Sequence, residues 1–572
     1  MKEHWQIHQP DPDVVDKMSR DLGYHPITAA VLVNREISTL SDAQDFFNTS
    51  LNNLRPPFSL RDMEAAVNRI HKAIISNEKI LIFGDYDVDG VTSVVILLNF
   101  LRYAGADVSY YIPHRITEGY SIQPGHITQY VRPNQFDLII TADCGAGSHQ
   151  AVEAANRFNI DVIVTDHHNI SEDIPPALAV INPKRHDCHA GLQNLAGVGV
   201  AFFLIICLRT RLREMGFWDK RPEPNLKEYC DLVALGTVAD MVPLIEENRI
   251  LSKTGLGLIN TGHRPGLTAL LEASAIRNQT LSAEDIAFRL APRLNAAGRM
   301  DHAARAVDLL IAEDIDAANK TAHTLNLLNR KRQDLEKGIL ADIERFIDKN
   351  SSLLRLRSLV LYQQGWHAGV LGIVASRMMR TYHRPVVLIS LQDGTGKGSA
   401  RSVEGLNIYD ALTACGPFLE GFGGHAMAAG LQIREENIAD FQNAFESEIQ
   451  RTSSPETLVP AIQIDSELEV GAISDDLIDE LELLMPFGVG NPEPLFLARD
   501  VKVVSSKIVG QNHRRMVLSQ TSGYATATIA AIHFNVNDDD AKKFHFDQMV
   551  FRLHWNRWNG KKTAQIVVED LQ

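Results

Sequence analysis

The sequence predicts a multidomain α/β protein whose first organised domain contains a parallel β-sheet and whose last domain is rich in β-strands. Between residues 79 and 168, buried strand-like segments alternate with helix-like segments, which is typical of a parallel sheet. From residue 457 onward, short segments of alternating apolar and polar residues favour a small barrel. Because the chain has 572 residues, it is too long for one hydrophobic core, and we expect three or four domains.

The elements of the sheet domain follow one another closely. KILIFG (79–84) is a buried strand that leads into DYDVDG, and the apolar run after it predicts a helix over 91–105, closed by Gly105. The rest of the alternation predicts three further strands and two helices: strands over 107–112, 136–143 and 161–168, and helices near 124–131 and over 148–158.

Acidic and imidazole side chains follow three of these strands, namely Asp85, Asp87 and Asp89 after the first, Asp143 at the end of the third, and Asp166, His167 and His168 at the end of the fourth. Ligands of a parallel sheet bind beyond the carboxyl ends of its strands, so we expect these side chains to lie together. One such aspartate alone would be explained equally well by a turn or a helix cap. Many carboxylates at one edge repel one another unless cations compensate them, and this ligand set suits Mn²⁺ or Mg²⁺.

Residues 195–350 are predicted to be mainly helical. The segment 230–244 reads as an apolar helix interrupted at Gly236 and running to Asp240, which by itself is a weak candidate for a functional carboxylate. The stretch 311–347 has apolar residues at helical spacing and no proline, so it predicts one long connecting helix, although a pair of surface helices also fits.

Composition is that of an ordinary globular protein, with 45% hydrophobic and 22% charged residues. No run of about 18 apolar residues predicts a membrane span. The five cysteines are scattered without CxxC pairs, which fits reduced thiols and a cytoplasmic location. A net charge of −15 argues weakly against nucleic-acid binding, but a cleft can be basic on an acidic body.

Two later segments are candidates for binding an anion. GKGSARS (396–402) follows a predicted strand over 384–390, and we interpret it as an anion-binding loop that presents Lys397, Ser399 and Arg401, with a surface turn as the alternative. GGHAMAAG (423–430) contributes His425 beside it. In the barrel, Trp555 and Trp558 offer stacking to a single strand, although packing within the barrel explains them at least as well.

The motifs DYDVDG, ADCG, TDHH and GTVADM, in that order, resemble the successive motifs of the DHH phosphoesterase superfamily. IPHRITEGY (112–120), RLNAAGRM (293–300), GWHAGVLGIVASR (365–377) and MPFGVGNPEPLF (485–496) are similar, more narrowly, to the RecJ family within it. The resemblance covers roughly residues 55–572. After an amino-terminal segment (residues 1–55), it implies a parallel-sheet DHH phosphoesterase domain (56–205) and a helical connector with one long helix (206–350). A second α/β DHH-associated domain (351–453) and a carboxyl-terminal OB-like β-barrel (454–572) follow.

The resemblance also implies the roles of single residues. It makes five side chains the ligands of two metal ions, with Asp143 as the bridge: Asp87, Asp89, Asp143, His167 and Asp240. His168 faces the substrate, Asp166 orients an imidazole, and Asp85 matches the motif without being a certain ligand. Phe83 departs from the pattern, because several members of the superfamily have a metal-binding histidine there.

For the substrate, the resemblance places Arg299 near the scissile phosphate as a catalytic residue alongside Asp143, His168 and Asp166. It makes Arg115, Ser399, Arg401 and His425 binders of the DNA, with Lys397 a weaker candidate. The implied activity is a metal-dependent 5′→3′ exonuclease that hydrolyses single-stranded DNA to 5′-mononucleotides in DNA repair and recombination. A bacterial, cytoplasmic monomer is implied, with single-strand-binding protein, a RecQ-type helicase and mismatch-repair proteins as partners.

Two other functions compete with this one. A DHH-type enzyme that cleaves short oligonucleotides or cyclic dinucleotides would share the metal motifs, but such enzymes generally lack the long helical insert and the terminal barrel. A non-catalytic replication scaffold on a degenerate fold would be expected to have lost metal ligands, whereas only the Phe83 position departs.

Overall fold

The computed structural model describes residues 4–262, 264–276, 280–522, 525–558 and 560–572, without the side chains of Ser522 and Trp558, so the stacking predicted for Trp558 lies outside the described part. Its first sheet is parallel throughout, as predicted, with the strand order β3-β2-β4-β5-β6. The strands are β2 (Lys79–Gly84), β3 (Asp107–Tyr111), β4 (Leu138–Ala142), β5 (Asp161–Thr165) and β6 (Ala179–Ile181).

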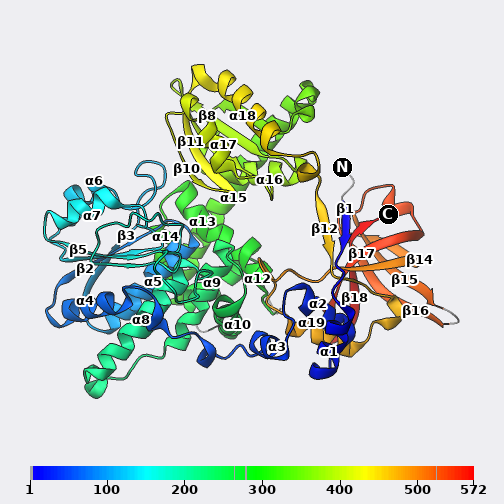
Figure 1. Ribbon diagram of the computed structural model, residues 1–572, viewed down its shortest axis with the longest axis horizontal. Helices are drawn as coiled ribbons and strands as arrows, with labels where there is room; N and C mark the ends of the chain where they lie inside the picture. The colour runs from blue at the N-terminus through cyan, green and yellow to red at the C-terminus, as the bar shows by residue number, and fades with distance from the viewer. Residues whose placement is uncertain (1–3, 263, 277–279, 523–524, 559) are drawn as a thin grey trace.

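Helices cover both faces of this sheet (Figure 1). One face packs against α4 (Met63–Ile75), α5 (Val88–Tyr103) and α8 (Gly197–Glu214), and the other against α6 (Pro124–His126), the π-helical turn Ile127–Val131 and α7 (His149–Asn156). Because both faces are buried, the strands are almost continuously apolar and polar side chains remain only at the strand ends.

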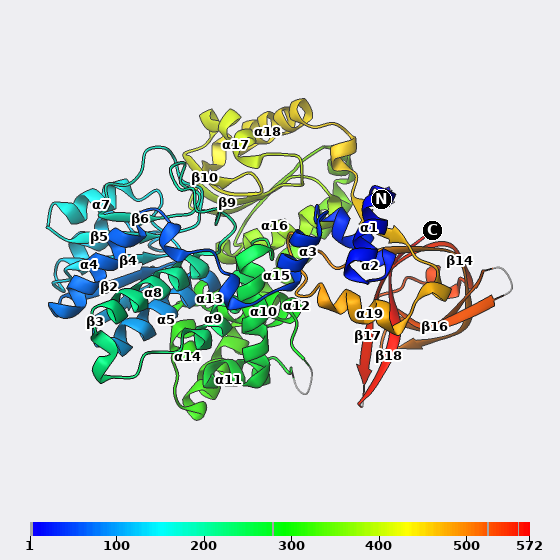
Figure 2. The ribbon, with the colours of Figure 1, turned by 60° about the horizontal axis from the view of Figure 1, so that its bottom comes forward.

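A helical region follows the sheet domain, as predicted. It consists of α9 (Cys230–Asp240), α10 (Glu246–Thr261), α11 (Pro265–Ala273), α12 (Ala283–Asp285), the π-helical turn Ile286–Leu290, α13 (Ala291–Met300), α14 (Ala304–Leu310) and α15 (Ile315–Lys349). The predicted long connecting helix is a single helix of 35 residues. It runs from the helical region into the next domain (Figures 1 and 2).

The predicted interruption of a helix at Gly236 is wrong, because α9 continues through this residue to Asp240. The glycine is required by packing. A Cβ atom there would lie 2.3 Å from Thr92 Oγ1 and 2.9 Å from Asp89 Oδ1. The missing side chain therefore lets α9 approach α5 closely, which brings Asp240 to the edge of the sheet.

Replacing Gly236 with alanine is expected to destabilise the protein by about 1–3 kcal/mol, because the added methyl group must displace buried side chains. Gly257→Ala is the matched control, since Gly257 lies within α10 and a Cβ atom added there would have no neighbouring atom within 4 Å. That control is expected to stabilise the protein by up to about 1 kcal/mol. Denaturant unfolding measures both changes, and an unaltered midpoint for Gly236→Ala would contradict this packing argument.

The second sheet is mixed, with the strand order β10-β11-β9-β8-β7. Its strands are β7 (Leu359–Gln364), β8 (Val386–Gln392), β9 (Thr395–Arg401), β10 (Gly421–His425) and β11 (Ala428–Arg434). Helix α16 (Ala368–Tyr382) packs between one face and α15, while α17 (Ile408–Ala414) and α18 (Ile438–Thr452) cover the other.

The prediction of a loop at GKGSARS is wrong, because most of this segment forms β9, which pairs with β8 and β11. Its glycines make room for neighbouring side chains. A Cβ atom on Gly396 would lie 2.6 Å from Ile389, and one on Gly398 would lie 2.8 Å from Leu431. The alternate residues Ser399 and Arg401 point to the face that α16 covers.

The carboxyl-terminal domain is a closed barrel in which β14 pairs with both β15 and β17. Its strands are β13 (Ser466–Glu467), β14 (Phe496–Val509), β15 (His513–Ser522), β16 (Ala525–His533), β17 (His545–Trp558) and β18 (Lys561–Leu571). Trp555 is 8% exposed and belongs to the barrel core, so packing accounts for this residue. No helix in the described ranges is long and apolar enough to cross a membrane.

The amino-terminal segment packs against this barrel (Figure 1). It contains β1 (His4–Ile7), α1 (Pro12–Leu22), α2 (Pro26–Asn34) and α3 (Leu40–Phe47), and β1 pairs in parallel with β12 (Ala461–Ile464). Val31 and Leu32 are fully buried in the barrel core, next to α19 (Asp475–Leu483). The guanidinium of Arg249 in α10 donates to carbonyl groups of Phe46, Leu483 and Leu484. These hydrogen bonds connect α10 to α3 and to the end of α19.

Candidate active site

The carboxyl ends of β2, β4 and β5 bring the predicted acidic and imidazole side chains together. Three groups of possible ligand atoms each lie within 4.8 Å of one another: Asp85, Asp87 and Asp143; Asp89, His167 and Asp240; and Asp143, His167 and His168. Asp143 and His167 each belong to two groups. The arrangement is therefore one continuous cluster with two adjoining centres.

The start of α5 positions two of these aspartates. Asp87 caps the helix, and its Oδ1 accepts hydrogen bonds from the amides of Asp89 at 3.0 Å and Gly90 at 3.2 Å. Asp89 accepts from the amides of Gly197 at 2.7 Å and Val198 at 2.9 Å, at the amino terminus of α8. These contacts hold both carboxylates in place while leaving lone pairs for a cation.

Asp143 follows β4 in a left-handed backbone conformation, with φ of 62°. Among residues other than glycine, aspartate and asparagine tolerate this region best. The side chain is 1% exposed, and its Oδ1 has no hydrogen-bond partner among the described residues. A Cβ atom on Gly197 would lie 2.5 Å from that oxygen, so α8 needs a glycine where it approaches the cluster.

His167 faces three carboxylates. Its Nε2 lies 3.2 Å from Asp143 Oδ1, 3.5 Å from Asp240 Oδ2 and 3.7 Å from Asp89 Oδ2. Neither ring nitrogen has a hydrogen-bond partner within the described part of the chain. Burial, with repulsion from His168, lowers the pKa of His167 to about 3, so the imidazole is neutral and has a lone pair to offer.

The residues fit a divalent metal centre. Burial and the neighbouring carboxylates raise the pKa of Asp143 and Asp240 well above the ordinary value, and the pKa of Asp89 to about 7. Buried polar groups normally have partners, whereas Asp85 Oδ1, Asp143 Oδ1 and both nitrogens of His167 have none among the described residues. Cations on these oxygen and imidazole ligands would satisfy both the charge and the unpaired atoms.

Phe83 contributes to the apolar core instead of the cluster. The side chain is 1% exposed and its ring stacks on Tyr111 with centroids 5.5 Å apart. The ring of His126 is a second neighbour, at 5.1 Å between centroids. Within the described residues, none of the three ligand groups includes a side chain from this position of β2.

Asp166 orients His168 and not His167. Its Oδ1 accepts from the amide of His167 at 2.7 Å and lies 2.8 Å from Nδ1 of His168, while Oδ2 accepts from the amide of Ala146 at 2.8 Å. Against the effect of burial, the contacts with His168 lower the pKa of Asp166 to about 2. The same contacts, again opposing burial, raise the pKa of His168 to about 9, so this half-exposed imidazole is a cation.

Three arginines from different parts of the chain lie near one another, and none has an ion pair within the described residues: Arg115, Arg299 and Arg401. Arg115 and Arg299 interact electrostatically with Asp85 and Asp87 of the cluster. Arg299 Nη1 donates to the carbonyl of Gly369 at 3.0 Å, and Arg401 donates to Ser376 and Ser399 hydroxyls at 3.0 and 3.1 Å. Burial and repulsion between the arginines lower the pKa of Arg299 to about 9 and that of Arg401 to about 10. Uncompensated cations beside a metal centre are typical of a phosphate-binding site.

The remaining predicted residues are placed less uniformly. Arg115 stacks on the ring of Tyr86 at 4.6 Å. His425 ends β10, and besides burial the charges of Arg401 and His168 lower its pKa, so it lies near both of these residues. Lys397 is exposed on β9, and no contact in the described residues joins it to the cluster.

Three residues of the site were not singled out from the sequence. Tyr120 Oη lies 3.3 Å from Nδ1 of His168 and 3.4 Å from the carbonyl oxygen of Asp143. Asn182 is buried and donates to the carbonyl of His168 at 2.9 Å. The charge of Lys184 partly opposes the rise in the pKa of Asp240 that burial and the neighbouring carboxylates cause. The segment IPHRITEGY carried a signal for Tyr120, because it matched the family pattern although only Arg115 in it had an assigned role.

Comparison with known families matches three domains along the chain. The DHH family N-terminal domain matches residues 79–237, the DHHA1 domain matches 356–451 and the RecJ OB domain matches 464–570. Among curated proteins, the single-stranded-DNA-specific exonuclease RecJ of Salmonella typhimurium is 36% identical over the whole of both chains. The protein of the same name from Escherichia coli is 35% identical, again over both whole chains.

Solved structures agree with this assignment. RecJ from Thermus thermophilus in complex with Mn²⁺ is 29% identical, with a TM-score of 0.82 over all of this chain and 79% of that one. A second structure, exonuclease RecJ bound to manganese, is 35% identical with a TM-score of 0.59 over 69% of this chain and 96% of that one. From the domain order, the full-length identity and the shared fold, this chain belongs to the RecJ family of DHH proteins.

Proposed function

We propose that this protein is a metal-dependent exonuclease that removes 5′-mononucleotides from single-stranded DNA in the 5′→3′ direction. One observation carries the proposal. A buried cluster of carboxylates and imidazoles, in which Asp143 belongs to two ligand groups, lies beside three arginines that have no ion pairs among the described residues. Curated relatives over the full length are named single-stranded-DNA-specific exonucleases, which supports this substrate class.

The metals that fit are Mn²⁺ or Mg²⁺, and related structures contain one or the other. Asp87 with Asp143 would hold one ion, assisted by Asp85, and Asp89, His167 and Asp240 would hold the second. Two divalent ions in such a centre supply Lewis acidity to the scissile phosphate and to an attacking water.

The side chains around the cluster then have separate tasks. His168, held as a cation by Asp166, donates to a non-bridging phosphate oxygen. Arg299 balances the charge that accumulates on the phosphate in the transition state. Arg115, Ser399, Arg401 and His425 bind the terminal phosphate and orient the strand, so that the first phosphodiester bond reaches the cluster.

A nuclease assay on the purified protein tests this function. Single strands labelled at the 5′ or the 3′ end, and a blunt duplex of the same sequence, are incubated with Mn²⁺. We expect 5′-labelled mononucleotide as the first product and little attack on the duplex. Release from the 3′ end first, or equal attack on the duplex, would refute the proposal. Cleavage confined to dinucleotides or cyclic dinucleotides in a length series would instead favour the short-substrate enzyme.

Arg401→Lys is expected to weaken the preference for a 5′-phosphate over a 5′-hydroxyl end about tenfold, because lysine loses the planar pair of donors that matches a phosphate. The ratio of kcat/KM on the two substrates measures this change. Arg434→Lys is the matched control, since Arg434 ends the neighbouring β11 and pairs with Glu420. An unaltered ratio in Arg401→Lys would remove this residue from the terminal-phosphate site.

We also propose that the protein acts as a monomer in the cytoplasm and cooperates with single-strand-binding protein, a RecQ-type helicase and mismatch-repair proteins. The family resemblance supports these partners. The three arginines without ion pairs suit the phosphates of a single DNA strand that a partner has made accessible. Light scattering of the purified protein tests the monomeric state, and a dimer at micromolar concentration would contradict it.

A further inference from the structure

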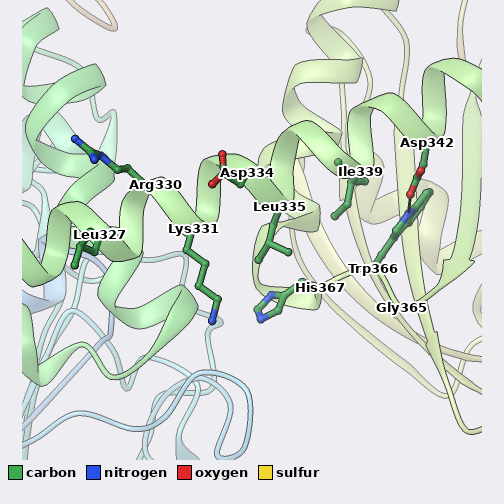
Figure 3. Close-up of a pocket in the computed structure, with 11 residues that line it drawn as sticks. Leu327, Arg330, Lys331, Asp334, Leu335, Ile339, Asp342, Gly365, Trp366 and His367 are labelled. Atoms are coloured by element: carbon green, nitrogen blue, oxygen red, sulfur yellow. Dashed lines mark hydrogen bonds between the residues drawn. The ribbon is translucent and has the colours of Figure 1, made fainter.

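A pocket of about 610 Å³ opens between α15 and the turn that precedes α16 (Figure 3). This volume is within the range of pockets that bind small organic groups. Leu327, Leu335 and Trp366 supply apolar walls. The polar part of the lining comprises Lys331, His367, Arg330, Asp334 and Asp342. The pocket therefore offers both a surface for a flat base and donors for an anion.

Along one face of α15, the side chains change from buried to exposed at this pocket. Leu327, Lys331, Leu335 and Ile339 are spaced four residues apart and so follow one another along one side of the helix. Ile339 is buried in the core that α15 forms with α16, whereas Leu327 is 50% exposed. In Figure 3, Lys331 and Leu335 extend towards the side where His367 lies, and Arg330 and Asp334 extend away from it.

Two cations, Arg330 and Lys331, line the pocket, and neither has an ion pair within the described residues. Within the described residues Lys331 forms no ion pair, and after burial its charge is the next cause that lowers the pKa of His367. The carboxylate of Asp342 is already engaged by Arg345 and Trp366. The other carboxylate of the lining, Asp334, extends away from His367 in Figure 3, so Lys331 and His367 face a space that can take an anion, although the chain as a whole carries a net charge of −15.

One residue, Gly369, joins the pocket to the arginines beside the cluster. His367 Nδ1 accepts from the amide of Gly369 at 3.1 Å, and the carbonyl of Gly369 accepts from Arg299 Nη1 at 3.0 Å. Arg299 and His367 therefore contact the same short turn, and Lys331 lines the pocket beside His367. His367 keeps Nε2 available as a donor, since no described residue bonds to it.

We propose that this pocket is a subsite for the DNA strand on the 3′ side of the scissile phosphate. This inference rests on the proposed function. Lys331 binds a phosphate beyond the scissile one, His367 assists through Nε2, and the attached base packs against Leu327 and Leu335. The subsite gives the enzyme a reason to prefer strands of several nucleotides over a dinucleotide, which has no phosphate to offer it.

Lys331→Met tests the subsite, with Lys337→Met as the matched control. Lys337 is an exposed lysine on the same helix that does not line the pocket. Activity with Mn²⁺ is measured on a 5′-phosphorylated dinucleotide and octanucleotide. We expect Lys331→Met to lower kcat/KM on the octanucleotide about tenfold and to leave the dinucleotide within about twofold. Lys337→Met is expected to match the unaltered protein on both.

Salt dependence provides a second readout. Fluorescence anisotropy of a labelled 20-mer in EDTA gives the slope of log affinity against log salt, which Lys331→Met is expected to reduce by about 0.7–1. An unaltered slope and octanucleotide activity in Lys331→Met would overturn the subsite while the unaltered protein still degrades DNA. Equal losses on both substrates would also overturn it, by placing Lys331 at the scissile phosphate. If the unaltered protein degrades no single strand, the proposed function fails instead.

Discussion

Replacing Asp143 with asparagine is expected to abolish DNA hydrolysis, with kcat lowered at least about 10³-fold, the upper end of the effect of removing one electrostatic group from an active site. The residue belongs to two of the three ligand groups and has an unpaired buried oxygen among the described residues. Asparagine keeps the shape and tolerates the left-handed backbone at this position, so the loss reports on charge and not on folding.

The variant should still bind a single strand, because the arginines remain in place. Anisotropy with a labelled strand measures binding, and a Mn²⁺ titration by calorimetry is expected to show at least one fewer ion bound. Asp173→Asn is the matched control, since that side chain is 91% exposed and lies outside the three ligand groups. Turnover that survives in Asp143→Asn would exclude this residue from the metal centre.

Arg299→Gln is expected to have the second largest effect, a fall in kcat of about 10²–10³-fold with KM changed much less. The guanidinium is anchored to the Gly369 carbonyl and lies close enough to Arg115 and Arg401 for the three charges to repel one another. Glutamine keeps a donor for Gly369 but removes the charge, which is needed most when the phosphate is most negative. Single-turnover rates at saturating DNA isolate this step.

Arg305→Gln provides the comparison for Arg299. Arg305 lies on the next helix, is half exposed and pairs with Asp301, so its loss is expected to leave kcat within about twofold. If Arg299→Gln raised KM tenfold or more and left kcat unaltered, Arg299 would bind the ground state and the transition state equally. Its assigned role at the scissile phosphate would then be wrong.

Alternation of strands and helices was sufficient to predict the parallel sheet and the edge at which its polar residues gather. The rule applies because the carboxyl ends of parallel strands lie at the same edge of the sheet, whatever side chains the strands carry. Asp240 is different, since α9 reaches the sheet edge only through the close approach at Gly236. Local sequence describes such a glycine as a helix breaker, because the neighbour that requires it comes from α5, more than a hundred residues earlier.

The segment GKGSARS shows the same limit. Its small residues read as a loop, but their cause is the bulk of Ile389, Leu431 and Ile433 on neighbouring strands. The sequence also did not show which imidazole of TDHH bonds to Asp166, because His167 and His168 were both candidates. The choice of His168 depends on the turn after β5, which aims Oδ1 of Asp166 at Nδ1 of that ring. The metal and substrate roles of these residues stay predictions for the experiments above.

The buried position of Val31 and Leu32 in the barrel core has a consequence for how the chain is synthesised. The same core contains Phe496 and Phe551, which leave the ribosome more than 450 residues later. At about 5–20 residues per second, α2 waits on the order of tens of seconds for those partners. During that time its apolar residues have no barrel to cover them, although the sheet domain can already close. Chaperone demand during translation should therefore arise from the first helices of the nascent chain and end only when its last strands emerge.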